Sequence, residues 1–198
     1  MAISAKDSAR SLTPLPLPIR AHPLVLGVVL FLASELMFFA ALFAGYFELR
    51  ANRAQWPPPM VDLKLDEAAF GTALLFAASA VMVLASKAMD RGRLRAARWW
   101  TATAIVAAVG FVLVAIHGYS NDAFTIATNA YGSIYYAMTG FHLLHVIAGI
   151  GILSALLIGM RSRALLVNHR AGAEAMTYYW HFVFIVWLGI FATIYLVK

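Results

Sequence analysis

One carboxylic acid stands inside a long apolar run and is the first residue whose chemistry needs an explanation. Glu35 is the single charged residue in VLFLASELMFFAALF, which runs from Val29 to Phe43. An ionised acid in the hydrocarbon core of a membrane is costly, so such residues usually face other helices or water. Two interpretations are open. Glu35 is either an uncharged acid that hydrogen-bonds to a neighbouring helix, or a group tied to proton or dioxygen traffic or to the tuning of a neighbouring subunit.

Two histidines in a second apolar stretch, TGFHLLHVIAGIGIL, are the next candidates. His142 and His145 are three residues apart, so a helix would place them on one face. They could bind a metal only with a third ligand, which no local motif supplies, and they could not hold a haem from opposite sides. We therefore expect hydrogen-bonded packing histidines and no metal site. Gly140, Gly149 and Gly151 predict a small-residue surface where another helix approaches closely.

The last apolar segment contains two further polar candidates. Glu174 is predicted to lie at the start of a helix, where a carboxylate interacts favourably with the helix dipole. His181 lies seven residues further on, about two turns deeper and on a similar face. Between them, Tyr178, Tyr179 and Trp180 predict an aromatic belt at the membrane interface. We include both Glu174 and His181 among the candidate buried polar residues.

The composition indicates a membrane protein. The chain is 63% hydrophobic and has a mean hydropathy of +0.80, whereas soluble domains are about 45–50% apolar. In a membrane protein the net charge of +6 is better explained by orientation in the bilayer than by binding of nucleic acid. The absence of cysteine excludes disulfides, thiolate-held iron–sulfur or zinc sites and a thiolate-bridged copper centre.

Five stretches are long enough to cross a hydrocarbon core, which takes about 20 helical residues. The sequence therefore predicts an all-α polytopic membrane protein in which residues 24–198 form a bundle of five transmembrane helices. Residues 1–23 are expected to form a cytoplasmic surface segment. A basic hinge is predicted over Asp90–Trp100 and a polar loop over His117–Phe124. The predicted spans are Leu24–Leu49, Ala68–Met89, Trp99–Ile116, Ile134–Met160 and Ala175–Val197.

The distribution of basic residues predicts the orientation. Of the 15 lysines and arginines, 11 fall in the N-terminal segment and the second and fourth connections, which lie on one side of the predicted membrane. The positive-inside rule places this side, and the N-terminus, in the cytoplasm, and it places the C-terminus outside. These basic residues could also bind anionic lipid headgroups, at about 1 kcal/mol each. The headgroup candidates near the last helix are Arg161, Arg163, His169 and Arg170.

Three segments in the same order resemble subunit III of the haem-copper oxidases. They are FLASELMFF, which contains Glu35 at the position of the family's carbodiimide-reactive glutamate, YAMTGFHLLHVIAGI, and the final NHRAGAEAMTYYWHFVFIVWLGIFATIYLVK. The resemblance covers residues 24–198 and is closest to the five-helix form found with bacterial cytochrome c oxidases, especially actinobacterial ones. The chain departs from the family at Phe184, where an aspartate is usual, and near the end of the third helix, where a glutamate is common.

The resemblance implies an accessory subunit of a proton-pumping terminal oxidase of aerobic respiration, located in the bacterial plasma membrane. Such a subunit carries no redox centre, because haem and copper belong to partner subunits. It packs on subunit I in a complex with subunit II and small subunits, and it binds phospholipid. It supports proton uptake and the stability of the catalytic subunit. A cytochrome bc-type complex is a further candidate partner in a supercomplex.

Two alternatives stay open at this point. Within the family, the chain could accompany a quinol oxidase or a nitric oxide reductase. From another class, it could be a small proton-coupled transporter that uses Glu35 and the two histidines of the fourth helix. The sequence shows neither the internal repeat nor the paired broken helices that such transporters commonly have, which favours the oxidase subunit.

Overall fold

The computed structural model describes residues 23–59, 61, 63–161 and 169–197, and in this part of the chain all regular structure is helical. The predicted all-α fold with five long helices is therefore confirmed. The elements are α1 (Pro23–Ala51), α2 (Leu65–Asp90), α3 (Leu94–Asn121), α4 (Ala130–Gly159), α5 (His169–Phe191) and the π-helix η2 (Ala192–Leu196).

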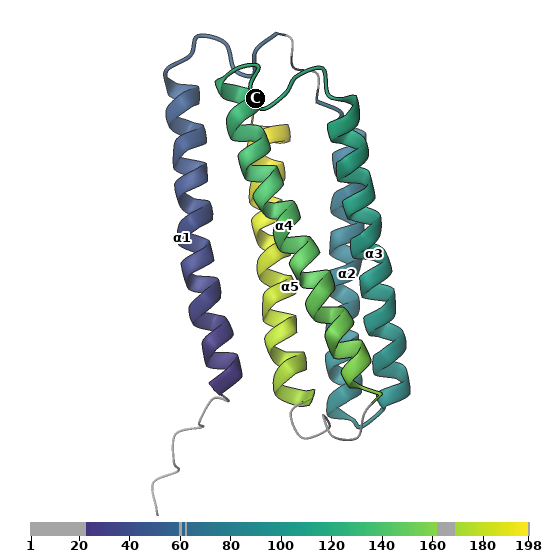
Figure 1. Cartoon of the computed structure of the whole chain (residues 1–198). Coiled ribbons are helices and arrows are strands. Elements are labelled where there is room, and N and C mark those ends of the chain that lie inside the picture. The colour runs from purple at the N-terminus through teal and green to yellow at the C-terminus, as the bar shows by residue number, and fades with distance from the viewer. Residues whose placement is uncertain (1–22, 60, 62, 162–168, 198) are drawn as a thin grey trace, which may run out of the picture.

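The five helices run up and down as one bundle, with Pro23 and η2 at opposite ends (Figure 1). Each membrane span has 26 to 30 residues and is apolar enough to cross a bilayer. At 1.5 Å per residue these helices are about 40 Å long, so they exceed a hydrocarbon core of about 30 Å. Several polar residues near the helix ends can therefore lie outside the hydrocarbon while their backbone stays helical.

The third helix shows this difference between a helix and its apolar part. It begins at Leu94 and ends at Asn121, so it extends five residues beyond the predicted Trp99–Ile116 at each end. The predicted basic hinge over Asp90–Trp100 is in fact a short turn around Gly92, whose φ is 68°. The first five residues of the predicted polar loop are likewise helical. A hydropathy pattern predicts only the part of a helix that lies in hydrocarbon. The helix itself can continue into polar residues as long as its backbone hydrogen bonds are made.

Helix α5 occupies the centre of the packing and contacts α1, α2 and α4, while α2 and α3 form a long antiparallel pair. Small residues allow the latter two helices to approach closely. Those buried along the α2–α3 pair include Ala78, Ala85, Ala97, Ala104 and Ala108. By contrast, the main contacts of α1 are with α4 and α5, and most of the α1 surface is left open (Figure 1).

The crossing of α4 and α5 depends on one glycine. A Cβ atom on Gly149 would lie 2.9 Å from the Tyr179 ring and 3.1 Å from the Trp180 ring, so a larger residue cannot fit without displacing them. A Cβ atom added to Gly140 or Gly151 would meet no other atom within 4 Å. Of the three glycines predicted to allow close helix approach, only Gly149 therefore does so in the described residues. Tyr179 and Trp180 are themselves buried in this contact, and the predicted interfacial belt is wrong for both.

Candidate functional site

Glu35 and His145 form a polar contact between α1 and α4 near the middle of both helices. The Oε2 atom of Glu35 lies 3.0 Å from Nε2 of His145. The Glu35 side chain is 21% exposed and the His145 side chain 16%. The structure thus brings the face of α1 that carries Glu35 against the face of α4 that carries His145.

The second ring nitrogen of His145 restricts where protons can lie. Its Nδ1 atom is 2.7 Å from the backbone oxygen of Phe141, which can only accept, so Nδ1 carries a proton. If the imidazole is neutral, Nε2 is an acceptor and Glu35 must donate; if the imidazole is charged, Glu35 is ionised and accepts. In both arrangements one proton is shared between the two groups, and the pair has no net charge.

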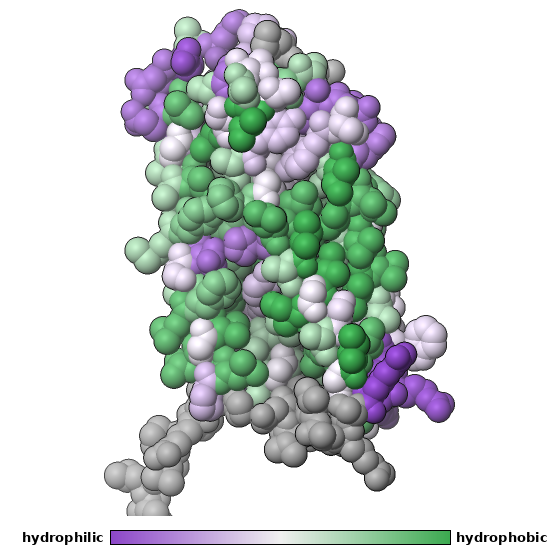
Figure 2. Space-filling view, in the orientation of Figure 1, coloured by the Kyte–Doolittle hydropathy of each residue, from purple (hydrophilic) through white to green (hydrophobic). Residues whose placement is uncertain are grey.

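Aromatic side chains and one hydroxyl hold this pair in place. Phe39 meets the His145 ring edge to face, with centroids 5.3 Å apart, and Phe38 packs similarly on Phe141 at 4.9 Å. The Tyr179 hydroxyl of α5 donates to the backbone oxygen of His145 at 2.7 Å. Figure 2 shows a small hydrophilic patch at mid-height on a face that is otherwise largely hydrophobic. A partly exposed acid and imidazole are polar groups that lipid tails solvate poorly.

His142 does not take part in this contact, although it lies on the same helix. Its ring is buried, stacks on Trp187 with centroids 5.1 Å apart and meets the edge of Phe111 at 5.8 Å. Neither ring nitrogen has a hydrogen-bond partner among the described residues. The prediction of a hydrogen-bonded histidine is therefore confirmed for His145 and wrong for His142. In the described part of the chain no three His, Asp or Glu side chains converge on a metal position.

The two polar candidates of α5 lie apart from the Glu35 contact. Glu174 is exposed and accepts a hydrogen bond from the Tyr178 hydroxyl at 3.1 Å. It is not at the start of the helix as predicted, because α5 already begins at His169. His181 is half-buried, and its Nδ1 lies 2.7 Å from the backbone oxygen of Thr177, so it donates within its own helix. Within the described residues, neither side chain is hydrogen-bonded to another helix.

Phe184, where the resemblance to subunit III leads us to expect an aspartate, packs on an aromatic side chain. Its ring lies against Phe76 of α2, with centroids 5.7 Å apart. An ionised acid at this position would have an aromatic neighbour in place of a hydrogen-bond donor. The phenylalanine thus fills a helix contact in this chain.

The lipid-headgroup candidates are only partly covered by the structure. Arg161 is exposed just after α4. Arg163 lies outside the described residues, and for His169 and Arg170 only the helical backbone is described. The exposed arginines Arg91, Arg93 and Arg95 lie at the same end of the bundle, in the turn from α2 to α3 and at the start of α3.

Sequence reasoning missed a second polar region, at the opposite end of the bundle from these arginines. There a cavity between α2, α3, α4, α5 and η2 is lined by tyrosines and acids, among them Glu67, Tyr119, Asp122, Tyr135 and Tyr195. Most of these residues lie at or beyond the predicted span ends, where tyrosine is usually explained as an interfacial anchor. The available signal was the density of tyrosine around residues 119–136 together with a carboxylate directly after a long helix.

Comparison with known proteins shows which family the sequence resembles over most of its length. Residues 18–198 match the family described as cytochrome c oxidase subunit III. The "Probable cytochrome c oxidase subunit 3" of Nocardia farcinica is 39% identical over 185 residues, which covers 90% of each chain. The protein of the same description from Mycobacterium tuberculosis is 36% identical over 183 residues, again covering 90% of each. The "Cytochrome c oxidase subunit 3" of Corynebacterium diphtheriae is 32% identical over 185 residues, with the same coverage.

Proposed function

Because the chain belongs to the cytochrome c oxidase subunit III family, we propose that it is the accessory, non-redox subunit of a proton-pumping cytochrome c oxidase. Membership makes it a multi-pass membrane subunit of an oxidoreductase complex that functions in aerobic respiration. The proposal goes further by assigning it a position against the catalytic subunit and a role in proton supply. Haem and copper are expected in the partner subunits.

The observation that carries this proposal is the position of the Glu35–His145 pair on the surface of the bundle. Both side chains are partly exposed at mid-membrane depth, where contact with lipid tails is unfavourable for polar groups. A partner helix that covered α1 and α4 would remove this cost. The open face of α1 also presents large apolar side chains, including Leu30 (63% exposed) and Met37 (76% exposed). We therefore assign the α1–α4 face to the interface with subunit I.

At such an interface the pair can hold one proton in either of two arrangements without changing its net charge. This property suits a group that supports proton uptake by a neighbouring subunit and stabilises that subunit, without itself performing redox chemistry. Tyr179 fixes the backbone at His145, so the imidazole is positioned by α5 as well as by its own helix. The pair is a structural and electrostatic support in this proposal.

The same proposal includes an orientation and a lipid surface. The end of the bundle with Arg91, Arg93, Arg95 and Arg161 faces the cytoplasm, and these side chains bind anionic phospholipid headgroups. The η2 end faces the outside of a bacterial plasma membrane. Subunit II, small subunits and a cytochrome bc-type complex are the further partners that we expect.

The test is purification in mild detergent through a tag on this chain, followed by a redox difference spectrum and identification of the co-purified subunits. We expect haem absorbance and subunit I in a constant ratio to the tagged chain. A mock purification from cells with the untagged chain is the control. A tagged chain that is correctly inserted but consistently arrives colourless and without subunit I would contradict the proposal.

A further inference from the structure

A cavity lies inside the bundle at the η2 end, between α2, α3, α4 and the last turns of the chain. Its volume is about 60 Å³, and the cavity is partly open to the surroundings. Its inner part is apolar and is lined by Phe111, Leu143 and Trp187. Its walls nearer the opening carry the tyrosines Tyr119, Tyr135 and Tyr195.

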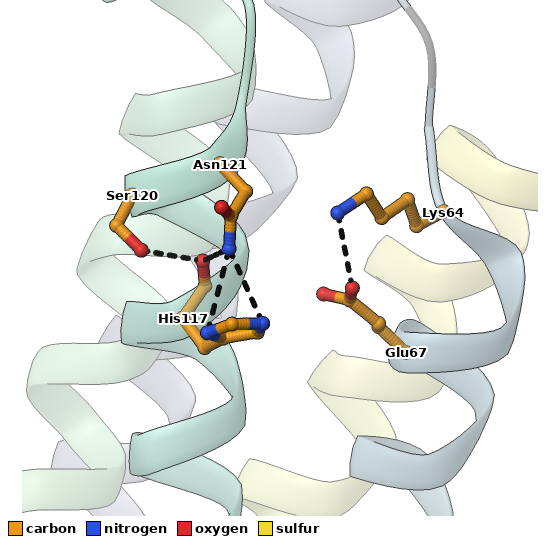
Figure 3. Close-up of polar contacts among 5 residues, drawn as sticks. All are labelled: Lys64, Glu67, His117, Ser120 and Asn121. Carbon is orange, nitrogen blue, oxygen red and sulfur yellow. Dashed lines mark hydrogen bonds and ion pairs between the residues drawn. The ribbon is translucent and has the colours of Figure 1, made fainter.

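The opening of the cavity has an excess of negative charge. Lys64 and Glu67 of the α2 start form an ion pair of 3.2 Å, and both line the cavity together with Asp122. Figure 3 shows Glu67 pointing from α2 towards His117 on α3, where Asn121 lies against the His117 ring. Since the Lys64 ammonium is paired with Glu67, the second carboxylate, Asp122, has no full counter-charge in the cavity lining.

Asp122 lies at the end of α3, where its own helix supplies no positive charge. It is the C-cap residue of α3, so it lies at the negative end of the helix dipole, and the last turn of this helix contains no basic residue. Its nearest described hydrogen bond comes from the Tyr136 hydroxyl at 3.4 Å, which is long. Burial raises the pKa of Asp122 from its usual value. Hydrogen bonds from Tyr136 and Tyr135 and the charge of Lys64 lower the pKa, while the charge of Glu67 raises it.

The π-helix η2 lines one side of the cavity. Residues Ala192–Leu196 form a π-helix, and this segment carries Tyr195. Short π-helical segments are rare and are frequent at functional sites. Tyr195 stacks on Phe191, with centroids 5.4 Å apart, so its ring is held as part of the wall.

We propose that this cavity binds a protonated amine on a short apolar stem. The ammonium group would lie near Asp122 and Glu67, where it supplies the missing positive charge, and the tyrosine rings would stabilise it through cation–π contacts. The apolar stem would fill the inner part against Phe111, Leu143 and Trp187. A divalent metal fits less well, since the described residues contain no group of three metal-ligating side chains. The amine is either a free alkylamine or the primary ammonium of a phospholipid headgroup.

The experiment is photolabelling of the complex that contains this chain, in nanodiscs, with a short primary alkylamine that carries a diazirine. We expect labelled peptides from 111–122 and 135–143, and we expect butylammonium but not butanol to compete. Asp122→Asn and Glu67→Gln each keep the side-chain shape and should reduce specific labelling by about tenfold or more, because a charge-assisted contact is lost. Glu48→Gln, at an exposed carboxylate on the same end of the bundle, is the matched control and should label normally.

Nanodiscs of different composition distinguish the two sources of the amine. If the occupant is a lipid headgroup, phosphatidylethanolamine should suppress labelling relative to phosphatidylglycerol, which has no ammonium. If it is a free amine, both lipids should give equal labelling that butylammonium still removes. Labelling that spreads over all five helices, competes equally with butanol, or persists in both carboxylate variants would overturn the proposal. None of these readouts depends on oxidase turnover.

Discussion

The carboxylate of Glu35 on α1 and the imidazole of His145 on α4 meet at 3.0 Å, and this contact joins the least buried helix to the rest of the bundle. Because the pair shares one proton and is neutral as a unit, it is compatible with a position inside a membrane. An isolated charge at the same place would be costly in the membrane. The predictions for Glu35 follow from this relationship.

Replacing Glu35 by glutamine should leave the complex assembled. The introduced amide group can still hydrogen-bond to Nε2 of His145, through its carbonyl or its NH₂, while the ionisable proton is removed. We expect oxygen consumption to change by less than about tenfold, which corresponds to under 1.4 kcal/mol of barrier. Steady-state oxygen consumption and subunit stoichiometry are the measurements. Abolished turnover in a fully assembled complex would make Glu35 an obligatory proton carrier instead.

Replacing Glu35 by alanine should be more damaging than glutamine. The change leaves His145 Nε2 without its partner in a partly buried position, at a cost of about 1–3 kcal/mol. We expect weaker retention of this chain or a shorter active lifetime of the oxidase. Glu48→Ala removes an exposed carboxylate from the same helix and is the control, with little effect expected. Equal behaviour of the glutamine and alanine variants would show that the hydrogen bond is unimportant.

The two glycines of α4 provide a matched test of the α4–α5 crossing. Gly149→Ala should destabilise the protein by about 1–3 kcal/mol, because the new methyl group lies too close to the Tyr179 and Trp180 rings. Gly151→Ala adds the same methyl group where nothing lies within 4 Å, and it should be neutral or stabilising. Thermal unfolding in detergent compares the two. A similar melting temperature for both variants would show that the rings move aside freely.

The stability of the chain should depend on the charge of Asp122. Its folded-state pKa is raised from 3.8, mainly by burial, so folding favours the protonated form. The contribution to stability is therefore greatest below about pH 3.8 and is lost as pH rises through the raised folded-state pKa. Asp122→Asn should raise the melting temperature at pH 8, and this gain should disappear below about pH 3.8. A gain that is constant with pH would exclude this explanation.

Topology can be tested with single cysteines, since the native chain has none. Arg91→Cys lies in the basic turn between α2 and α3, and Gln55→Cys lies in the connection between α1 and α2; both positions are exposed. If the basic end is cytoplasmic, an impermeant thiol reagent should label Gln55→Cys in intact cells and should label Arg91→Cys only after lysis. The reverse pattern would invert the proposed orientation.

The sequence by itself determined the number and approximate position of the membrane helices. Apolar runs of about 20 residues are a local property, and only a helix can satisfy the backbone of such a run in lipid. The sequence also singled out Glu35, because a lone acid in such a run is visible without any structure. The sequence did not predict where the helices begin and end. Polar residues continue α3 beyond the hydrocarbon, and α5 starts before Glu174.

Only the tertiary structure decided which helix each polar side chain meets. His142 and His145 are three residues apart, which at 3.6 residues per turn leaves about 60° between them. That angle is small enough to suggest one face from the sequence, yet large enough for His145 to reach Glu35 on α1 while His142 stacks on Trp187 of α5. The cavity around Asp122 was likewise hidden, because its walls come from four segments far apart in the chain. The packing of the helices, which depends on contacts between all of them at once, brings these segments together.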